Sequence, residues 1–327
     1  MTFYVTGVII HNVMMYSWVV FVKNDINCII LCAGQGSRMN DETKNKVCFE
    51  VAGKPAVVRV VENLKKCGVS KFVVVVGNKS ESVMKALKDV EGVMYAFQPV
   101  QLGTGNAVMC GLRLLNNFGI DGRVLTVMGD KLIDKSVFQK LIDDFYENKS
   151  DISFIVQPAA FNPSGGKVAM SEGKVSGIVE HMDLLLLKVC ELMRSGMSAE
   201  DAFSAIELTK KQSDKISVAL ASLGQAAKDH YVEINGEVFT SDEIISSGVV
   251  NCATYLHKRS VLDEIVSNLS ADNAQNEIYF TDTISEVSKN GVVSYVEVDE
   301  RELIHTFNTV EELNAINDFF KGVNIDE

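Results

Sequence analysis

The stretch "LCAGQGSRMNDETKNKV", residues 31–47, decides the fold because an apolar strand ends there in a glycine-containing loop. A dinucleotide fingerprint, G-x-G-x-x-G, would need a third glycine at Met39, and no Walker A pattern, GxxxxGK[ST], is present. Glycines lack a Cβ, so their backbone N–H groups can approach phosphate oxygens closely. Arg38 adds a planar charged group and Lys46 a mobile point charge. The loop therefore predicts a site for a triphosphate.

Short β-branched runs alternate with helical patterns from residue 27 onward. Residues 28–31, 71–77, 93–97 and 123–128 read as buried strands, and 55–68, 80–90 and 105–117 as helices. Continuously apolar strands separated by helices predict an α/β fold of Rossmann-like type, with a mixed, mostly parallel sheet flanked by helices. Ligands of such sheets bind beyond the carboxyl ends of the strands, where both the quoted loop and "MGD" at 128–130 fall.

The pattern changes after residue 150, where strands of a mixed extension are expected. Between them lies a helical insertion at about 184–246, whose apolar residues recur at helical spacing. We expect one domain, 27–327, interrupted by this insertion. The apolar extension, 1–26, carries no charge in its first 22 residues but is interrupted by polar ones, so we expect added strands in preference to a membrane anchor or signal peptide.

Charge and composition restrict the partners. The formal net charge of −12 argues against nucleic-acid and anionic-membrane partners, although a small polyanion can bind a locally basic pocket. The seven cysteines form no CxxC pair and the five histidines no HExxH motif, which predicts reduced thiols in a cytoplasmic protein and no zinc site. The sequence leaves a homo-oligomer open.

Several motifs in order carry a resemblance to a known family: "LCAGQGSRM", "KVCFEVAGKPAVV", "QPVQLGTGNAV", "MGD", "GGKV", "GKVSGIVEH", "VNCATYL", "NAQNEIYFTD" and "FNTVEEL". With these motifs the sequence resembles the sugar-phosphate nucleotidyltransferases, and in particular the uridylyltransferase half of the bifunctional bacterial enzyme that makes UDP-N-acetylglucosamine. The resemblance covers roughly residues 27–320 outside the insertion and implies a GT-A-like nucleotidyltransferase fold.

The resemblance implies roles for residues on the nucleotide side. Arg38 and Lys46 would be the catalytic cations that hold phosphates. Gln98 would read the uracil edge, and its amide offers the donor and acceptor that this base requires. Thr104 would help to read the base, or would only cap a helix. The nucleotide-binding residues implied are Leu31, Cys32, Ala33, Gly34, Gly36, Gln98, Gly103, Thr104 and Gly129. Cys32 and Cys48 are expected to pack and not to act as nucleophiles.

The same resemblance implies a metal pair and a sugar-phosphate site. Asp130 and Asn308 would bind Mg²⁺, which prefers oxygen ligands and keeps several waters. Asn308 could instead cap a helix, because it precedes a Thr-x-x-Glu start. Glu180 could instead be a solvated strand end. The sugar-phosphate-binding residues implied are Gly166, Glu180, Asn251, Tyr279 and Thr281.

The implied reaction joins UTP and N-acetylglucosamine-1-phosphate to give UDP-N-acetylglucosamine and pyrophosphate by direct displacement. One alternative is a pyrophosphorylase for another sugar-1-phosphate, such as glucose-1-phosphate with UTP or dTTP. Another is a catalytically silent relative that binds nucleotide sugars. The sequence differs from the family pattern at Lys131, directly after the metal-binding Asp, and in its insertion. Acetyl transfer is not expected, because the chain stops soon after the resembling region.

Overall fold

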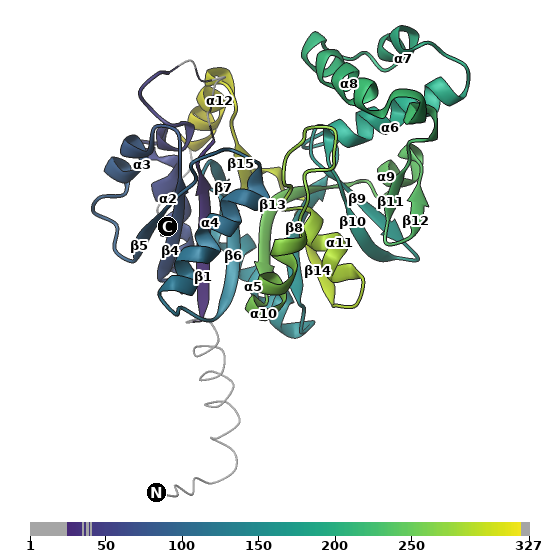
Figure 1. Ribbon diagram of the computed structural model, residues 1–327. Helices are drawn as coiled ribbons and strands as arrows, with labels where there is room; N and C mark the ends of the chain where they lie inside the picture. The colour runs from purple at the N-terminus through teal and green to yellow at the C-terminus, as the bar shows by residue number, and fades with distance from the viewer. Residues whose placement is uncertain (1–24, 35, 37–38, 40, 322–327) are drawn as a thin grey trace, which may run out of the picture. The chain divides into compact units, whose positions relative to one another are not determined.

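The computed structural model describes residues 25–34, 36, 39 and 41–321, with only the backbone of Glu302. Most of the expected N-terminal extension and Arg38 therefore lie outside the described residues. The chain forms two compact units. Unit 1 consists of Met1–Pro99, Cys110–Gln139 and Glu302–Glu327, and unit 2 of Val100–Met109 and Lys140–Arg301. Figure 1 labels their elements.

Unit 1 contains a parallel sheet. Its strand order is β6 (Arg123–Met128), β1 (Ile26–Cys32), β4 (Lys71–Val76) and β5 (Val93–Phe97). All three pairings are parallel. Every residue of β1 is buried, which explains the uninterrupted apolar run at residues 28–32. Since the four strands run in one direction, their carboxyl ends share one edge.

Helices, two of them shared with unit 2, alternate with these strands along the chain. They are α2 (Ala56–Lys66), α3 (Ser80–Ala86), α4 (Thr104–Asn117), which begins in unit 2, and α5 (Lys135–Glu147), which ends there. In Figure 1, α4 lies in front of β1 and β6. The contact is so close at Gly111 that a Cβ there would come within 2.9 Å of Ile29 Cγ2. A short pair, β2 (Glu50–Val51) and β3 (Lys54–Pro55), completes this part.

A second antiparallel pair connects distant parts of unit 1. The strand β7 (Lys131–Ile133) follows β6 and pairs with β15 (Ile304–Thr306), with Thr306 opposite Lys131. Helix α12 (Val310–Phe320) follows β15, and Thr309 is its N-cap, accepting the Glu312 N–H at 3.2 Å. Asn308 is therefore not the capping residue of this helix.

Unit 2 contains a mixed sheet of β10 (Lys174–Val179), β9 (Lys167–Ser171), β13 (Val249–His257), β8 (Ile152–Pro158) and β14 (Val293–Glu297). The pairings are antiparallel except that of β14 with β8. Strand β13 changes register between Asn251 and Tyr255, and Ala253 has a positive φ of 48°. Bulges of this kind re-aim side chains next to functional sites. With unit 1, this confirms the α/β class and the mixed, mostly parallel sheet.

The insertion is not purely helical. It comprises α6 (His181–Arg194), α7 (Ala199–Ala205), α8 (Lys210–Leu223), η3 (Gly224–Asp229), β11 (Val232–Ile234), β12 (Glu237–Phe239) and α9 (Ser241–Ser246). The hairpin β11–β12 turns at Asn235 and Gly236, both with positive φ (55° and 83°). An Asn-Gly pair between apolar residues is a strong hairpin signal, and it was present in "EINGEV".

The insertion shares its core with the sheet of unit 2. On one side of α6, Leu184 and Leu187 pack with Ile234 and Phe239 of the hairpin and with Ala169 and Val179 of β9 and β10. On the other side, Met182, Leu186 and Val189 pack with Ala202 of α7 and Ile216 of α8. Excision of the insertion would thus open the core of unit 2.

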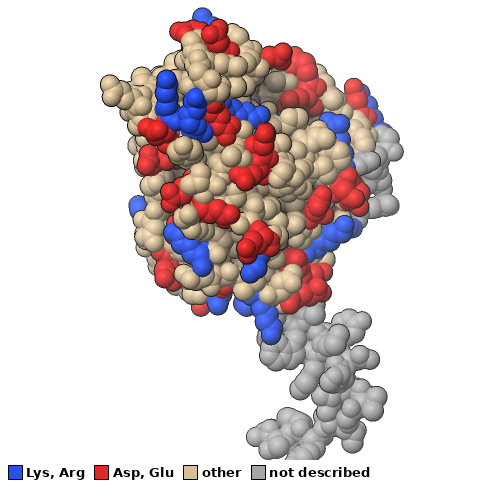
Figure 2. Space-filling view, turned by 90° about the vertical axis from the view of Figure 1, so that its right-hand side faces the viewer, with Lys and Arg blue, Asp and Glu red and all other residues tan. Residues whose placement is uncertain are grey.

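Acidic side chains are spread among lysines and arginines over the face shown in Figure 2, in keeping with the net charge of −12. A polyanionic substrate therefore requires a local group of cations. Across the described residues, no helix has the length and apolar character needed to cross a membrane.

Candidate active site

Three side chains predicted to handle phosphates and metal meet in unit 1. The Lys46 ammonium forms an ion pair with the Asp130 carboxylate and donates a hydrogen bond of 2.8 Å to Asn308 Oδ1. The Lys46 and Asp130 side chains are each 14% exposed. The ammonium also lies 5.6 Å from the ring centre of Phe307. The predicted catalytic lysine thus joins the two predicted metal ligands.

Strand geometry explains why residues so far apart in sequence meet. Asp130 lies in the turn between β6 and β7, and the pairing of Thr306 with Lys131 places the residues after β15 beside that turn. The turn itself is held close to β1, because the Gly129 N–H donates to the Leu31 carbonyl at 3.0 Å. A Cβ at Gly129 would come within 2.5 Å of Cys32 Sγ, so only glycine fits. Gly129 therefore allows the turn before Asp130 to pack closely against Cys32.

The Asn45 side chain hydrogen-bonds to the glycine loop after β1, and the sequence patterns did not predict a role for this residue. This buried residue precedes Lys46, and its amide nitrogen lies 3.1 Å from the Cys32 carbonyl, 3.2 Å from that of Gly34 and 2.9 Å from that of Asn78. Its Oδ1 accepts the Val47 N–H at 3.2 Å. One side chain thus joins the loops after β1 and β4 to the segment that carries Lys46.

The loop after β1 presents mainly backbone. Leu31, Cys32 and Ala33 are buried, and burial raises the pKa of the Cys32 thiol well above its usual value, as expected of a packing residue. Gly34 is exposed, and a Cβ there would have open space around it. Gly36 has a positive φ of 58°, and a Cβ there would lie 2.9 Å from Lys46 Cβ. The loop thus lies against the stem of Lys46.

Gln98 lies at the same sheet edge, directly after β5. It is buried, and its N–H donates to the Val76 carbonyl at 2.8 Å. Gly77 lies between the two loops, since a Cβ there would be 3.0 Å from Ala33 Cβ and 3.3 Å from the Gln98 carbonyl oxygen. Unit 1 therefore brings Gln98 next to the predicted nucleotide loop.

In unit 2, the "QLGTG" motif packs against the "EIYFTD" motif. The Ile278 N–H donates to the Leu102 carbonyl at 2.7 Å, and the Phe280 N–H to Thr104 Oγ1 at 3.0 Å. Gly103 has a φ of 108°, and a Cβ there would lie 2.5 Å from the Ile278 carbonyl oxygen. Helix α4 begins at Thr104, and the hydroxyl of Thr104 also accepts the hydrogen bond from the "EIYFTD" motif.

Four of the predicted sugar-phosphate residues are connected in unit 2. Thr281 Oγ1 donates to Glu180 Oε1 at 3.0 Å, and Glu180 Oε2 would lie 3.2 Å from a Cβ at Gly166. The Asn251 N–H donates to the Gly166 carbonyl at 2.9 Å, and its side-chain amide donates to the Tyr255 hydroxyl at 2.6 Å. Glu180 is thus a partly buried, hydrogen-bonded group and not a freely solvated strand end.

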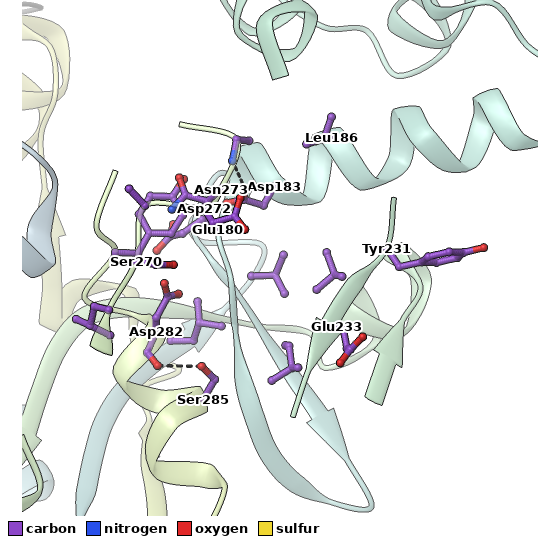
Figure 3. Close-up of a pocket in the computed structure, with 18 of the residues that line it drawn as sticks. Glu180, Asp183, Leu186, Tyr231, Glu233, Ser270, Asp272, Asn273, Asp282 and Ser285 are labelled. Atoms are coloured by element: carbon purple, nitrogen blue, oxygen red, sulfur yellow. Dashed lines mark hydrogen bonds between the residues drawn. The ribbon is translucent and has the colours of Figure 1, made fainter. Parts of the chain in front are cut away.

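The fifth residue, Tyr279, lines a pocket with Glu180. This pocket of about 920 Å³ lies between the ends of α8 and β11 in the insertion and the segment around residues 268–289. Its carboxylates are Glu180, Asp183, Glu233, Asp272, Asp282 and Glu286, against a single lysine, Lys289, among the lining residues that the structure describes. Figure 3 shows Glu180, Asp183 and Asp272 gathered near the first turn of α6, with Asp282 below them. The pocket suits hydroxyl or amine donors better than phosphate.

Burial and mutual repulsion perturb the carboxylates of this pocket. Burial, then Asp183, Glu180 and Glu286, raise the pKa of Asp282 from 3.8 to about 7. Burial also raises the pKa of Asp183, although the Ala274 N–H donates to its carboxylate at 2.7 Å. The sequence did not predict roles for these two residues.

Asp282→Asn is expected to stabilise the protein at neutral pH and above. A carboxyl whose pKa is higher in the folded than in the unfolded protein destabilises the fold once it loses its proton. That penalty is absent below about pH 4, grows up to about pH 7 and is constant above. We expect a gain of about 1–3 kcal/mol in the free energy of unfolding at about pH 8 and none at about pH 4. Denaturant unfolding across this range measures the gain.

Asp242→Asn is the matched control, because Asp242 also lies in the first turn of a short helix, α9, but is exposed. It removes the same charge and should show no gain that grows between about pH 4 and 7. If the two variants showed equal pH profiles, this would contradict the destabilising effect assigned to the ionised Asp282 carboxylate.

Comparisons with known proteins show what the chain is similar to. Residues 28–188 match the MobA-like NTP transferase domain. The bifunctional protein GlmU of Staphylococcus saprophyticus is 28% identical over 295 residues, 89% of this chain and 50% of that protein. GlmU of Clostridium kluyveri is 39% identical over 186 residues, 55% of this chain and 40% of that protein. The chain thus spans about half the length of these relatives.

A solved structure shares the fold. UDP-glucose pyrophosphorylase complexed with UDP-glucose superposes with a TM-score of 0.60 at 16% identity, over 90% of this chain and 98% of that one. At this identity the likeness concerns the fold alone. Residues 28–188 are thus similar to MobA-like NTP transferase domains, and the resemblance of the chain to the uridylyltransferase half of the bifunctional bacterial enzymes is confirmed.

Proposed function

We propose that the protein joins UTP to N-acetylglucosamine-1-phosphate, forming UDP-N-acetylglucosamine and releasing pyrophosphate. The observation that carries the proposal is the contact of Lys46 with both Asp130 and Asn308 beside the glycine loop. A lysine, a carboxylate and an amide oxygen at the carboxyl edge of a parallel sheet suit a nucleoside triphosphate and its metal. The similarity to GlmU proteins supports the choice of sugar.

The chemistry requires positioning and charge neutralisation above all. A phosphate oxygen of the sugar-1-phosphate attacks the α-phosphorus of UTP, and the bond to the pyrophosphate breaks. The attacking group is already anionic, so no general base is needed. Lys46 would neutralise charge on the phosphates, and Arg38 is proposed to do the same. Asn45 would keep the loop in the shape that receives them.

Asp130 and Asn308 fit a divalent cation, which we propose to be Mg²⁺. Both offer hard oxygen donors, and Mg²⁺ takes few protein ligands because it keeps waters and phosphate oxygens. When bound, the ion would supply charge neutralisation to the phosphates.

A substrate panel tests the proposal. Purified protein is incubated with each of the four nucleoside triphosphates and with N-acetylglucosamine-1-phosphate or glucose-1-phosphate, and pyrophosphate release is measured. The expected result is release with UTP and N-acetylglucosamine-1-phosphate. Release only with glucose-1-phosphate would identify a different sugar. Binding of a UDP-sugar without release from any pair would indicate a silent relative.

Asn45→Asp is expected to raise the Michaelis constant for UTP by about tenfold or more, with a smaller effect on that for the sugar phosphate. The new carboxylate would face the carbonyl oxygens of Cys32, Gly34 and Asn78, so the loop would lose its donors and be repelled. Each unpaired buried group costs about 1–3 kcal/mol. Initial rates at varied UTP and varied sugar phosphate give both constants.

Asn27→Asp is the matched control. Asn27 is equally buried, lies at the opposite end of β1 and donates to the carbonyl of Asp121 at 2.8 Å. It should lower thermal stability by a similar amount and leave the Michaelis constant for UTP unchanged. Equal shifts of that constant in both variants would show a general loss of stability.

A further inference from the structure

We propose that Lys46 holds Asp130 and Asn308 in the nucleotide-free protein and must release them before a divalent cation can bind there. The nucleotide phosphates would attract Lys46 away, so cation and nucleotide bind cooperatively. This inference rests on the metal site of the proposed function and adds an order to its assembly.

The geometry carries the inference. One ammonium contacts the carboxylate of Asp130 and the only amide oxygen of Asn308, which are the two groups proposed as metal ligands. The contact is largely shielded from water, with the Lys46 and Asp130 side chains each 14% exposed. Gly36 and the ring of Phe307 lie against the same lysine side chain. Lys46 is therefore seated where a cation would be expected.

Two cations cannot occupy this place together. Mg²⁺ requires oxygen ligands at about 2.0–2.1 Å, whereas the ammonium already uses these oxygens. Like charges a few ångströms apart in a partly buried site repel strongly. A metal that binds only when the lysine is absent has an apparent affinity reduced by the fraction of molecules in that state. If Lys46 is docked in about nine molecules out of ten, removing it should tighten metal binding about tenfold.

Mn²⁺ binding to the nucleotide-free full chain tests this without any turnover. Free Mn²⁺ is followed by electron paramagnetic resonance during titration of wild type, Lys46→Met and Lys44→Met. Lys44 lies two positions earlier, with its ammonium 5.1 Å from the ring centre of Phe49. The control therefore removes the same charge nearby but leaves the three-residue contact. We expect about tenfold tighter binding for Lys46→Met and a much smaller change for Lys44→Met.

Two further measurements locate the effect. Adding Asp130→Asn to Lys46→Met should abolish the tightening, because the ion would lose its carboxylate. A non-hydrolysable UTP analogue should strengthen Mn²⁺ binding more in wild type than in Lys46→Met, since part of that coupling comes from displacing the lysine. Thermal denaturation of each variant confirms that the titrated protein is folded.

Unchanged or weaker Mn²⁺ binding by Lys46→Met would overturn the inference, as would equal tightening by Lys44→Met. Tightening that persists with Asp130→Asn would place the ion elsewhere and also overturn it. These outcomes are separate from the substrate panel. A chain that releases no pyrophosphate can still show the lysine-dependent Mn²⁺ binding, and an active chain can lack it.

Discussion

Asp130→Asn is expected to lower the turnover number by about a hundredfold or more, with a smaller effect on the affinity for UTP. Asp130 follows β6 at the carboxyl edge of the sheet and pairs with Lys46. The substitution removes the carboxylate charge that would face both Lys46 and the proposed metal ion, while it keeps the shape of the side chain. Losses of this size are typical when a preorganised charge near the reacting phosphates is removed. Steady-state rates in saturating Mg²⁺ and a UTP titration separate the two effects.

Asp134→Asn is the control for this substitution. Asp134 lies four positions later, after β7, and its carboxylate accepts the Ser136 N–H at 2.8 Å. Asparagine serves equally well in such a turn, so turnover should stay near that of wild type. If Asp130→Asn also retained near wild-type turnover, Asp130 would have no part in the mechanism.

Gln98→Leu is expected to remove most of the preference for UTP over CTP. A buried amide that pairs with one base edge rejects a base that leaves it unpaired, at about 1–3 kcal/mol or about 10–100-fold. Wild type should therefore prefer UTP to CTP. The base of dTTP keeps the hydrogen-bonding edge of uracil, so kcat/KM should fall less for dTTP than for CTP. The ratio of kcat/KM for the two nucleotides measures the preference, and the dependence on Mg²⁺ should not change.

Gln101→Leu makes the same exchange at an exposed position three residues later. The UTP preference should survive this change. A wild-type protein that uses CTP as readily as UTP would remove the role assigned to Gln98 and weaken the uridylyltransferase proposal with it.

The sequence predicts well whatever depends on local patterns. Apolar runs located β1, β4, β5 and β6, and helix α2 ends shortly before Gly68, whose φ is 86°. Because parallel strands share one edge, the grouping of the glycine loop, Gln98 and Asp130 could also be expected before the structure.

Long-range pairings could not be predicted from such patterns. Nothing near Asn45 in the sequence indicates that its amide reaches the carbonyl of Asn78. The cap at Thr309 in place of Asn308 depends on which of two adjacent polar residues faces the helix, and propensity alone does not decide this. The hairpin β11–β12 did have a local signal, but the helical periodicity around it dominated the interpretation.

The pairing of β7 with β15 also bears on how the protein is made. Lys46 and Asn308 are 262 positions apart, and unit 1 is built from three separate stretches of chain. During synthesis the amino-terminal strands emerge long before the stretch that pairs with β7, and contacts of such sequence separation form slowly. A nascent chain can therefore assemble β1, β4, β5 and β6 while Asp130 still lacks Asn308 beside it. The contact of Lys46 with both Asp130 and Asn308 would thus form late in folding, only after β15 has emerged from the ribosome.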